Sequence, residues 1–134
     1  MEDKSLIKKR TYEFALKIID LYKTLISKNE YVLSKQLLKA GTSIGANVEE
    51  ALAEQSRADF LSKMSIASKE ARESNYWLRL IRDSKILEDR FITPLIAESS
   101  EIIRMLTSIV KTTSNSSTLR SGSTTAAEDG KLKI

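Results

Sequence analysis

One stretch of the sequence constrains the fold more than any other, because small or apolar side chains recur there at alternating spacings of three and four residues. The seven positions are Phe60, Met64, Ala67, Ala71, Ser74, Leu78 and Ile81. An α-helix turns once every 3.6 residues, so this spacing places all of them on one stripe of a single helix. No proline precedes Pro94, which allows such helices to run uninterrupted. The sequence therefore predicts long helices that each bury one face.

Three further segments have the same period. A helix over residues 5–27 would bury Phe14, Ile18, Leu21 and Leu25. A second would start at Ser34, an N-cap residue whose neighbours Leu33 and Leu38 suit a hydrophobic staple. Its expected buried stripe is Leu37, Ala40, Ile44, Asn47 and Ala51.

The helix that contains residues 60–81 has a cap candidate in Ser56, and a fourth helix is predicted to follow Thr93 and Pro94. The stripe of this fourth helix is Leu95, Ser99, Ile102, Leu106 and Ile109. Four helices of about 20 residues, joined by roughly three to eight residues, favour antiparallel neighbours. The predicted fold is all-α, an up-down-up-down four-helix bundle.

The domain organisation follows from a change in composition near residue 113. The chain has 134 residues, a length that suits one domain with its own core. Beyond residue 113 the sequence is rich in Ser and Thr and has few large apolar residues. We predict a bundle over residues 1–113 and a disordered tail over residues 114–134.

Composition excludes several classes of site. The chain has neither Cys nor His, which removes disulfides, thiolate or imidazole metal sites, and catalytic triads that use His. It has no apolar stretch typical of a signal peptide or a membrane span, so we expect a cytoplasmic protein. We predict no cofactor, no metal, no small-molecule substrate and no enzymatic activity. The net charge of +4 permits an acidic partner or a nucleic acid.

The second helix carries an unusual combination of small and polar residues. Gly41 and Gly45 each cost about 1 kcal/mol of helix stability relative to Ala, and close packing against another helix would compensate. A phosphate-binding loop is the alternative, but it would need a preceding strand and a Gly-Lys-Ser/Thr ending. Asn47 on the buried stripe needs hydrogen-bond partners, for which Glu50 and Glu73 are candidates. A structural polar network is the favoured interpretation, and a functional pocket stays open.

Acidic residues gather near the end of the second helix. Glu49, Glu50, Glu54 and Asp59 could be the carboxylates of a metal-dependent nuclease. With no His and no second acidic motif, a solvated helix end is favoured.

A basic stripe runs along the third helix, roughly opposite its buried face. Its members are Lys69, Arg72, Tyr76, Arg79 and Arg82. Cations at helical spacing can follow phosphates, and an interleaved aromatic ring can stack on a base. The ordinary alternative is the solvated face of a helix.

The third and fourth helices also have more apolar side chains than one buried face needs. The surplus residues are Ile66, Trp77, Leu80, Ile96, Ile103 and Val110. Such extra stripes indicate contacts between subunits, with a wide core face as the alternative.

Three segments together resemble the four-helix-bundle family named for the 23S rRNA intervening-sequence proteins. They read SIGANVEEA over residues 43–51, IASKEARESNYWL over residues 66–78 and LTSIVKT over residues 106–112. The resemblance covers most of residues 10–113. Ala51 stands where the family commonly has Gly, a change that should strengthen the helix.

The resemblance implies a ring-shaped homopentamer. A related group includes the accessory proteins of diversity-generating retroelements, which implies RNA, DNA or a reverse transcriptase as partners. The leading hypothesis is therefore a non-enzymatic oligomeric bundle that binds nucleic acid or a nucleoprotein. The alternatives are a protein-interaction scaffold that binds no nucleic acid and, less favoured, the metal-dependent nuclease.

Overall fold

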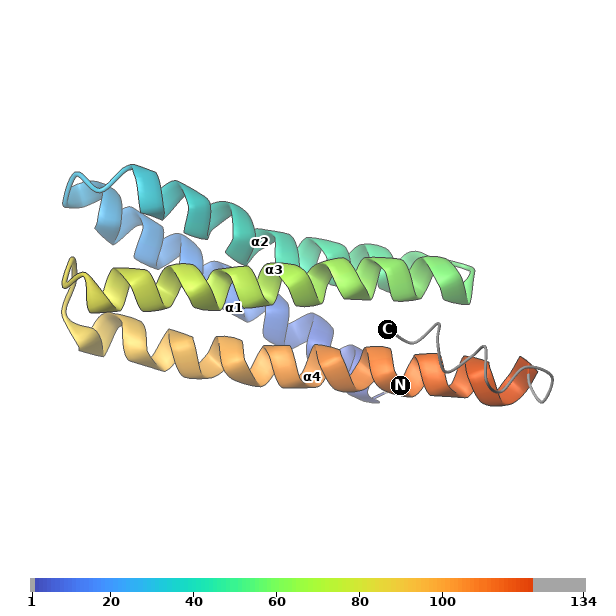
Figure 1. The fold of residues 1–134 in the computed structure, drawn as a ribbon. Coiled ribbons are helices and arrows are strands. Elements are labelled where there is room, and N and C mark those ends of the chain that lie inside the picture. Colours follow the sequence, from blue (N-terminus) through green and yellow to red (C-terminus); the bar gives the residue numbers. More distant parts are fainter. Residues whose placement is uncertain (1, 122–134) are drawn as a thin grey trace.

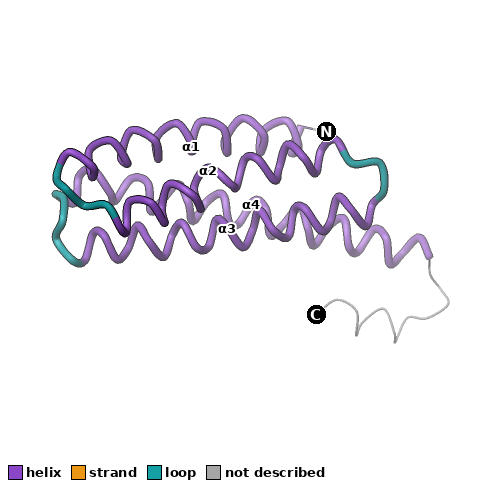
Figure 2. Tube along the Cα trace, turned by 90° about the horizontal axis from the view of Figure 1, so that it is seen from above, coloured by secondary structure: helices purple, strands orange, loops and turns teal. Residues whose placement is uncertain are grey.

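The computed structural model describes residues 2–121 of the chain. It contains four helices: α1 (Glu2–Ser27), α2 (Val32–Ala53), α3 (Arg57–Asp83) and α4 (Asp89–Ser121). Each helix runs antiparallel to the next and packs on it, and α4 also contacts α1 (Figure 1). The loops after α1 and α3 lie at one end of the bundle and the loop after α2 at the other (Figure 2). The predicted up-down-up-down four-helix bundle is confirmed. No helix in the described range is long and apolar enough to cross a membrane.

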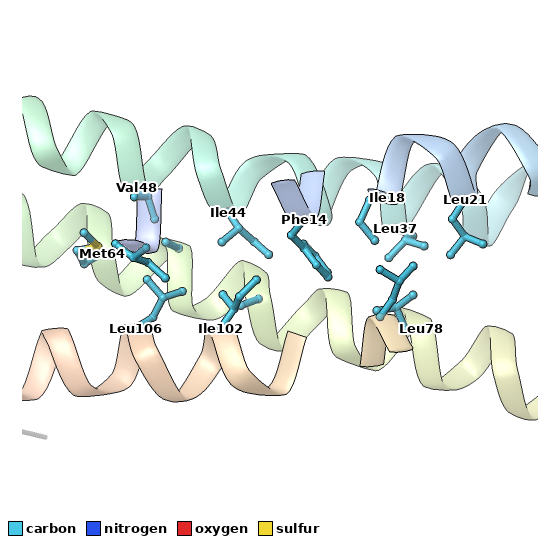
Figure 3. Close-up of a cluster of buried hydrophobic side chains, with 14 of the residues drawn as sticks. Phe14, Ile18, Leu21, Leu37, Ile44, Val48, Met64, Leu78, Ile102 and Leu106 are labelled. Atoms are coloured by element: carbon cyan, nitrogen blue, oxygen red, sulfur yellow. The ribbon is translucent and has the colours of Figure 1, made fainter. Parts of the chain in front are cut away.

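The core consists of the stripes that the sequence predicts, with one exception on α2. All seven predicted positions on α3 are buried, and so are the predicted stripes of α1 and α4. Side chains from α1 and α2 meet those from α3 and α4 at mid-bundle, where Phe14 points between the two pairs of helices (Figure 3). On α2, Val48 is fully buried where the sequence predicted Asn47, and Asn47 lies beside the stripe.

The two glycines of α2 lie against α1. A Cβ atom built on Gly41 would lie 2.9 Å from both Cγ atoms of the buried Ile18. The same atom on Gly45 would be 3.4 Å from the backbone oxygen of Thr11, an ordinary contact. Gly41 is therefore the position where only a bare backbone fits against its neighbour.

The helix starts agree with the sequence at α3 but not at α2. The Ser56 hydroxyl accepts a hydrogen bond from the Asp59 amide at 3.0 Å, which confirms the predicted cap. The prediction that Ser34 caps α2 is wrong, because this helix begins earlier, at Val32. The carboxylate of Glu30 accepts from the Leu33 and Ser34 amides at 3.2 and 2.7 Å, so Glu30 satisfies these free donors instead.

The ends of α4 also differ from expectation. The helix starts at Asp89, which places Pro94 inside it rather than in its first turn. Ile92, which is fully buried, lies in the added turn, so the gain in buried apolar surface outweighs the hydrogen bond that proline cannot donate. At the other end α4 continues to Ser121, so residues 114–121 are helical where disorder was predicted. The rest of the predicted tail lies outside the described residues.

Two ion pairs join the first helix to the last. Arg10 pairs with Glu101, and the Nζ atom of Lys17 lies 2.9 Å from a carboxylate oxygen of Glu98. The hydrogen bond from Arg10 lowers the pKa of the Glu101 carboxyl. Both pairs link α1 to α4 at the partly exposed surface, where ion pairs add little to stability.

Removing the α3 cap gives the first testable prediction. In Ser56→Ala the Asp59 amide loses its acceptor, and we expect the free energy of unfolding to fall by about 1 kcal/mol. Urea unfolding followed by circular dichroism measures the change. The matched control is Ser62→Ala, at an exposed position of α3, for which we expect no loss. Equal stability of Ser56→Ala and wild type would contradict the role of the cap.

Candidate nucleic-acid interface

Most of the predicted basic stripe lies exposed on the outer face of α3. Lys69, Arg72 and Arg79 are exposed, and Tyr76 retains 47% of its accessible surface. Arg82 differs, because its Nε donates to a carboxylate oxygen of Asp83 at 2.8 Å. That hydrogen bond raises the pKa of Arg82 and lowers the pKa of Asp83. Arg82 is therefore already neutralised by its neighbour in the chain.

A relay of polar contacts from α4 positions the aromatic residue and its cation. The Oγ atom of Ser99 on α4 accepts a hydrogen bond from Asn75 Nδ2 at 2.9 Å. The Oδ1 atom of the same Asn75 accepts from Arg79 Nε at 2.8 Å. The guanidinium carbon of Arg79 then lies 5.8 Å from the centre of the Tyr76 ring, within the range of a cation–π contact. The ring and the cation are thus held together on one face.

Farther along α3, Arg72 reaches across to α4. Its Nη2 donates to Thr107 Oγ1 at 3.3 Å, beside an open hollow of about 460 Å³ between the two helices. The hollow is lined by Ser65, Ser68, Arg72, Thr107, Val110, Lys111, Ser114 and Asn115. Most of these residues are polar or charged, but the surface that they present to the hollow is mainly apolar.

Lys111 is a basic residue that the sequence analysis missed. It lies on α4, is exposed, and lines the same hollow as Arg72. The periodicity of one helix shows which of its own residues share a face, but not which residues of another helix lie beside them. We call Lys69, Arg72, Tyr76 and Arg79 of α3, together with Lys111 of α4, the basic surface.

Like most Lys and Arg side chains in residues 2–121, the cations of the basic surface form no ion pair with a carboxylate. Within residues 2–121, none of Lys69, Arg72, Arg79 and Lys111 forms an ion pair with a carboxylate. The cations that do are Arg10, Lys17, Lys63, Arg82 and Arg90. Two of the four still have an acidic neighbour: the charge of Lys69 opposes the rise in the pKa of Glu70, and the charge of Arg79 helps to lower the pKa of Asp83.

The polar network proposed around α2 does not assemble. Asn47 donates to the carbonyl oxygen of Ser43 in its own helix at 2.9 Å. Glu50 is exposed and accepts from Lys63 on α3 at 2.8 Å. The structure does not join Glu73 to either residue. The charge of Glu73 instead acts on Glu70, whose pKa is raised mainly by burial and further by that charge. Because Asn47 lies beside the core rather than in it, its own helix backbone suffices as a partner.

The acidic residues near the end of α2 do not gather into a site. In the described part of the chain, no group of three or more Asp or Glu side chains is arranged to hold a metal ion. Instead, Glu50 is paired with Lys63, and the charges of Glu54 and Asp59 add to the rise in the pKa of that lysine, while Glu49 is exposed.

The surplus apolar residues fall into two sets. Trp77, Ile96, Ile103 and Val110 are partly buried and pack against the core, so they widen the core face. Ile66 and Leu80 stay 38% and 37% exposed on α3. The structure adds an exposed apolar set on α1 that the sequence analysis missed, consisting of Leu6, Tyr12 and Leu16.

Comparison with known proteins decides the family. The family model described as 23S rRNA-intervening sequence protein matches residues 3–108. The chain belongs to the 23S rRNA-intervening sequence protein family. The matched range includes Lys69, Arg72, Tyr76 and Arg79, whereas Lys111 lies just beyond it. The family description names no catalytic activity.

A solved structure agrees with this family membership. The crystal structure of a protein of unknown function from the S23 ribosomal protein family of Bacteroides thetaiotaomicron is 44% identical to the chain, with a TM-score of 0.79. The similarity covers 81% of this chain and 98% of that one. A comparison with curated proteins finds no match.

Proposed function

We propose that the protein is a non-enzymatic, oligomeric bundle that binds nucleic acid through its basic surface. The observation that carries the proposal is that four exposed cations, Lys69, Arg72, Arg79 and Lys111, lie on the adjacent helices α3 and α4, with Arg72 and Lys111 lining one hollow between them. Neutralising phosphates releases condensed counterions, which supplies most of the affinity of such surfaces. Cations already paired with a carboxylate would contribute less.

The partner is an RNA or DNA strand, free or held in a nucleoprotein such as a reverse transcriptase complex. The family name records a location in rRNA intervening sequences and no binding partner. The resemblance to retroelement accessory proteins is what supports this class of partner. Because such partners occur in the cytoplasm, the proposed location of the protein is cytoplasmic.

Self-association is the second part of the proposal. Exposed apolar side chains on opposite sides of the bundle, such as Leu16 on α1 and Leu80 on α3, offer surface for contacts between subunits. Two separate patches favour head-to-tail contacts that close into a ring, and the family resemblance supports five subunits. Light scattering should give a mass near five chains, and a monomer at all concentrations would contradict this part.

Charge reversal tests nucleic-acid binding. In Arg72→Glu/Arg79→Glu we expect affinity for a fluorescein-labelled oligonucleotide, measured by anisotropy in 50 mM salt, to fall at least about tenfold. We also expect the slope of log affinity against log salt to fall by about two, because two phosphate contacts are lost.

The matched control reverses two exposed lysines on α1, in Lys9→Glu/Lys23→Glu. Its net charge equals that of the test variant, but its changes lie away from the basic surface. Equal loss in both variants would show that only net charge matters. If wild type binds no oligonucleotide but recovers a protein partner, the scaffold function replaces the proposal.

A further inference from the structure

We infer that the basic surface takes a single strand rather than a duplex, with a base on Tyr76 and a phosphate at the edge of the hollow beside Arg72 and Lys111. This inference rests on the proposed function and names its substrate class. Two observations carry it: the exposed ring of Tyr76, and the hollow between α3 and α4 that begins one helical turn away at Arg72.

The ring of Tyr76 is built as a platform. It is about half exposed, Arg79 lies over it, and the edge-on ring of Trp77 supports it with the ring centres 5.2 Å apart and the planes at 67°. Stacking requires the flat face of a base, and in a duplex neighbouring base pairs cover that face. The exposed ring of Tyr76, with Arg79 beside it, can therefore add its full stacking energy to binding only when the base is unpaired.

The edge of the hollow near Arg72 is where a phosphate of such a strand would meet positive charge. Arg72 and Lys111 supply that charge from α3 and α4, and Thr107, which already accepts a hydrogen bond from Arg72, supplies a hydroxyl. Arg72 and Tyr76 are one turn apart on α3, about 6 Å along the helix axis. Nucleotides rise about 3.4 Å per residue in a stacked strand, so a phosphate at Arg72 and a base on Tyr76 are about two nucleotides apart.

The test compares a 12-nucleotide single strand with a blunt 12-base-pair duplex of the same sequence, each as RNA and as DNA, by anisotropy with the full-length protein. We expect the single strand to bind at least tenfold more tightly. In Tyr76→Ala we expect affinity for the single strand to fall roughly 5- to 150-fold, while affinity for the duplex is unchanged. Tyr76→Phe keeps the ring and should bind like wild type.

Two further readouts separate stacking from charge. Lys111→Gln should reduce the salt slope by about one without abolishing stacking, whereas Tyr76→Ala should leave the salt slope unchanged. Trp77 is the only tryptophan of the chain, so its fluorescence reports directly on a base that stacks against the neighbouring Tyr76. Single-strand binding should change the Trp77 emission in wild type and Tyr76→Phe but not in Tyr76→Ala.

The outcomes keep the two proposals apart. If single strand and duplex bind equally and Tyr76→Ala alters neither, the single-strand inference is wrong while nucleic-acid binding stands. If no oligonucleotide binds at low salt, the proposed function fails and the inference fails with it. A preference for the RNA over the DNA single strand would show that the ribose hydroxyl is recognised.

Discussion

Replacing Phe14 with alanine is expected to lower the free energy of unfolding by about 3–5 kcal/mol. Phe14 is fully buried and points from α1 into the middle of the bundle, where all four helices contribute side chains (Figure 3). Its removal forfeits the transfer energy of the ring and leaves a cavity that the surrounding helices fill only in part. Domains of this size have a total stability of about 5–15 kcal/mol, so the variant should be near its folding limit.

Chemical denaturation followed by circular dichroism measures this loss, with the dependence on denaturant compared between variants to check that unfolding stays two-state. The control is Tyr12→Ala, because Tyr12 is an aromatic residue of the same helix that is 59% exposed. We expect that change to stay within about 0.5 kcal/mol of wild type. If Phe14→Ala also lowered the free energy of unfolding by no more than about 0.5 kcal/mol, the centre of the bundle would be loosely packed.

Alanine at the two glycines of α2 is expected to change stability in opposite directions. Gly41→Ala would press a methyl group against Ile18 at 2.9 Å, and overpacking of this kind costs about 1–3 kcal/mol. The gain in helix propensity, about 1 kcal/mol, offsets only part of that. Gly45→Ala makes ordinary contacts at 3.4 Å, so the propensity gain should dominate and raise stability by up to about 1 kcal/mol.

A double-mutant cycle identifies the source of the Gly41 effect. Ile18→Ala removes both Cγ atoms that the new methyl group would meet, so Gly41→Ala should cost less in that background. We expect a coupling energy of about 0.5–3 kcal/mol between the two positions. Additive effects would show that the clash with Ile18 is not the cause, and a stabilised Gly41→Ala would show that α1 and α2 can separate freely.

The sequence predicts α3 almost completely because local and tertiary signals agree there. Ser56 offers a cap where the apolar period begins, and the same seven positions that repeat in the sequence are buried in the bundle. A long straight helix between α2 and α4 can keep a single stripe facing inward over its whole length. Each signal alone would have been weaker than their agreement.

On α2 and α4, burial of an apolar side chain outweighs the local sequence preference on which the prediction rested. Counting three residues on from Ile44 gives Asn47, and counting four gives Val48; the helical period allows both, and burial of the apolar side chain decides. At α4 the preference of proline for the first turn is outweighed by the burial of Ile92. Propensity is a small energy, and it gives way when a large apolar side chain can reach the core.

The sequence predicts only part of the basic surface, because this surface spans two helices. The spacing of Lys69, Arg72, Tyr76 and Arg79 shows that they share the outer face of α3. That Lys111 lies beside Arg72 depends on how α4 is shifted along α3, which contacts such as the one between Arg72 and Thr107 reveal. The neutralisation of Arg82 by Asp83 likewise depends on a rotamer that spacing does not specify.

The salt links between α1 and α4 set a condition on how the chain is made. Three of the helix pairs join neighbours in the sequence, so each can form as a hairpin soon after its second helix leaves the ribosome. Arg10 and Lys17 emerge well before their partners Glu101 and Glu98, which come 91 and 81 residues later. Elongation adds about 5–20 residues per second, so several seconds pass between the synthesis of α1 and that of its partners on α4. During this time the face of α1 that later packs on α4 is exposed to the ribosome and to other nascent chains.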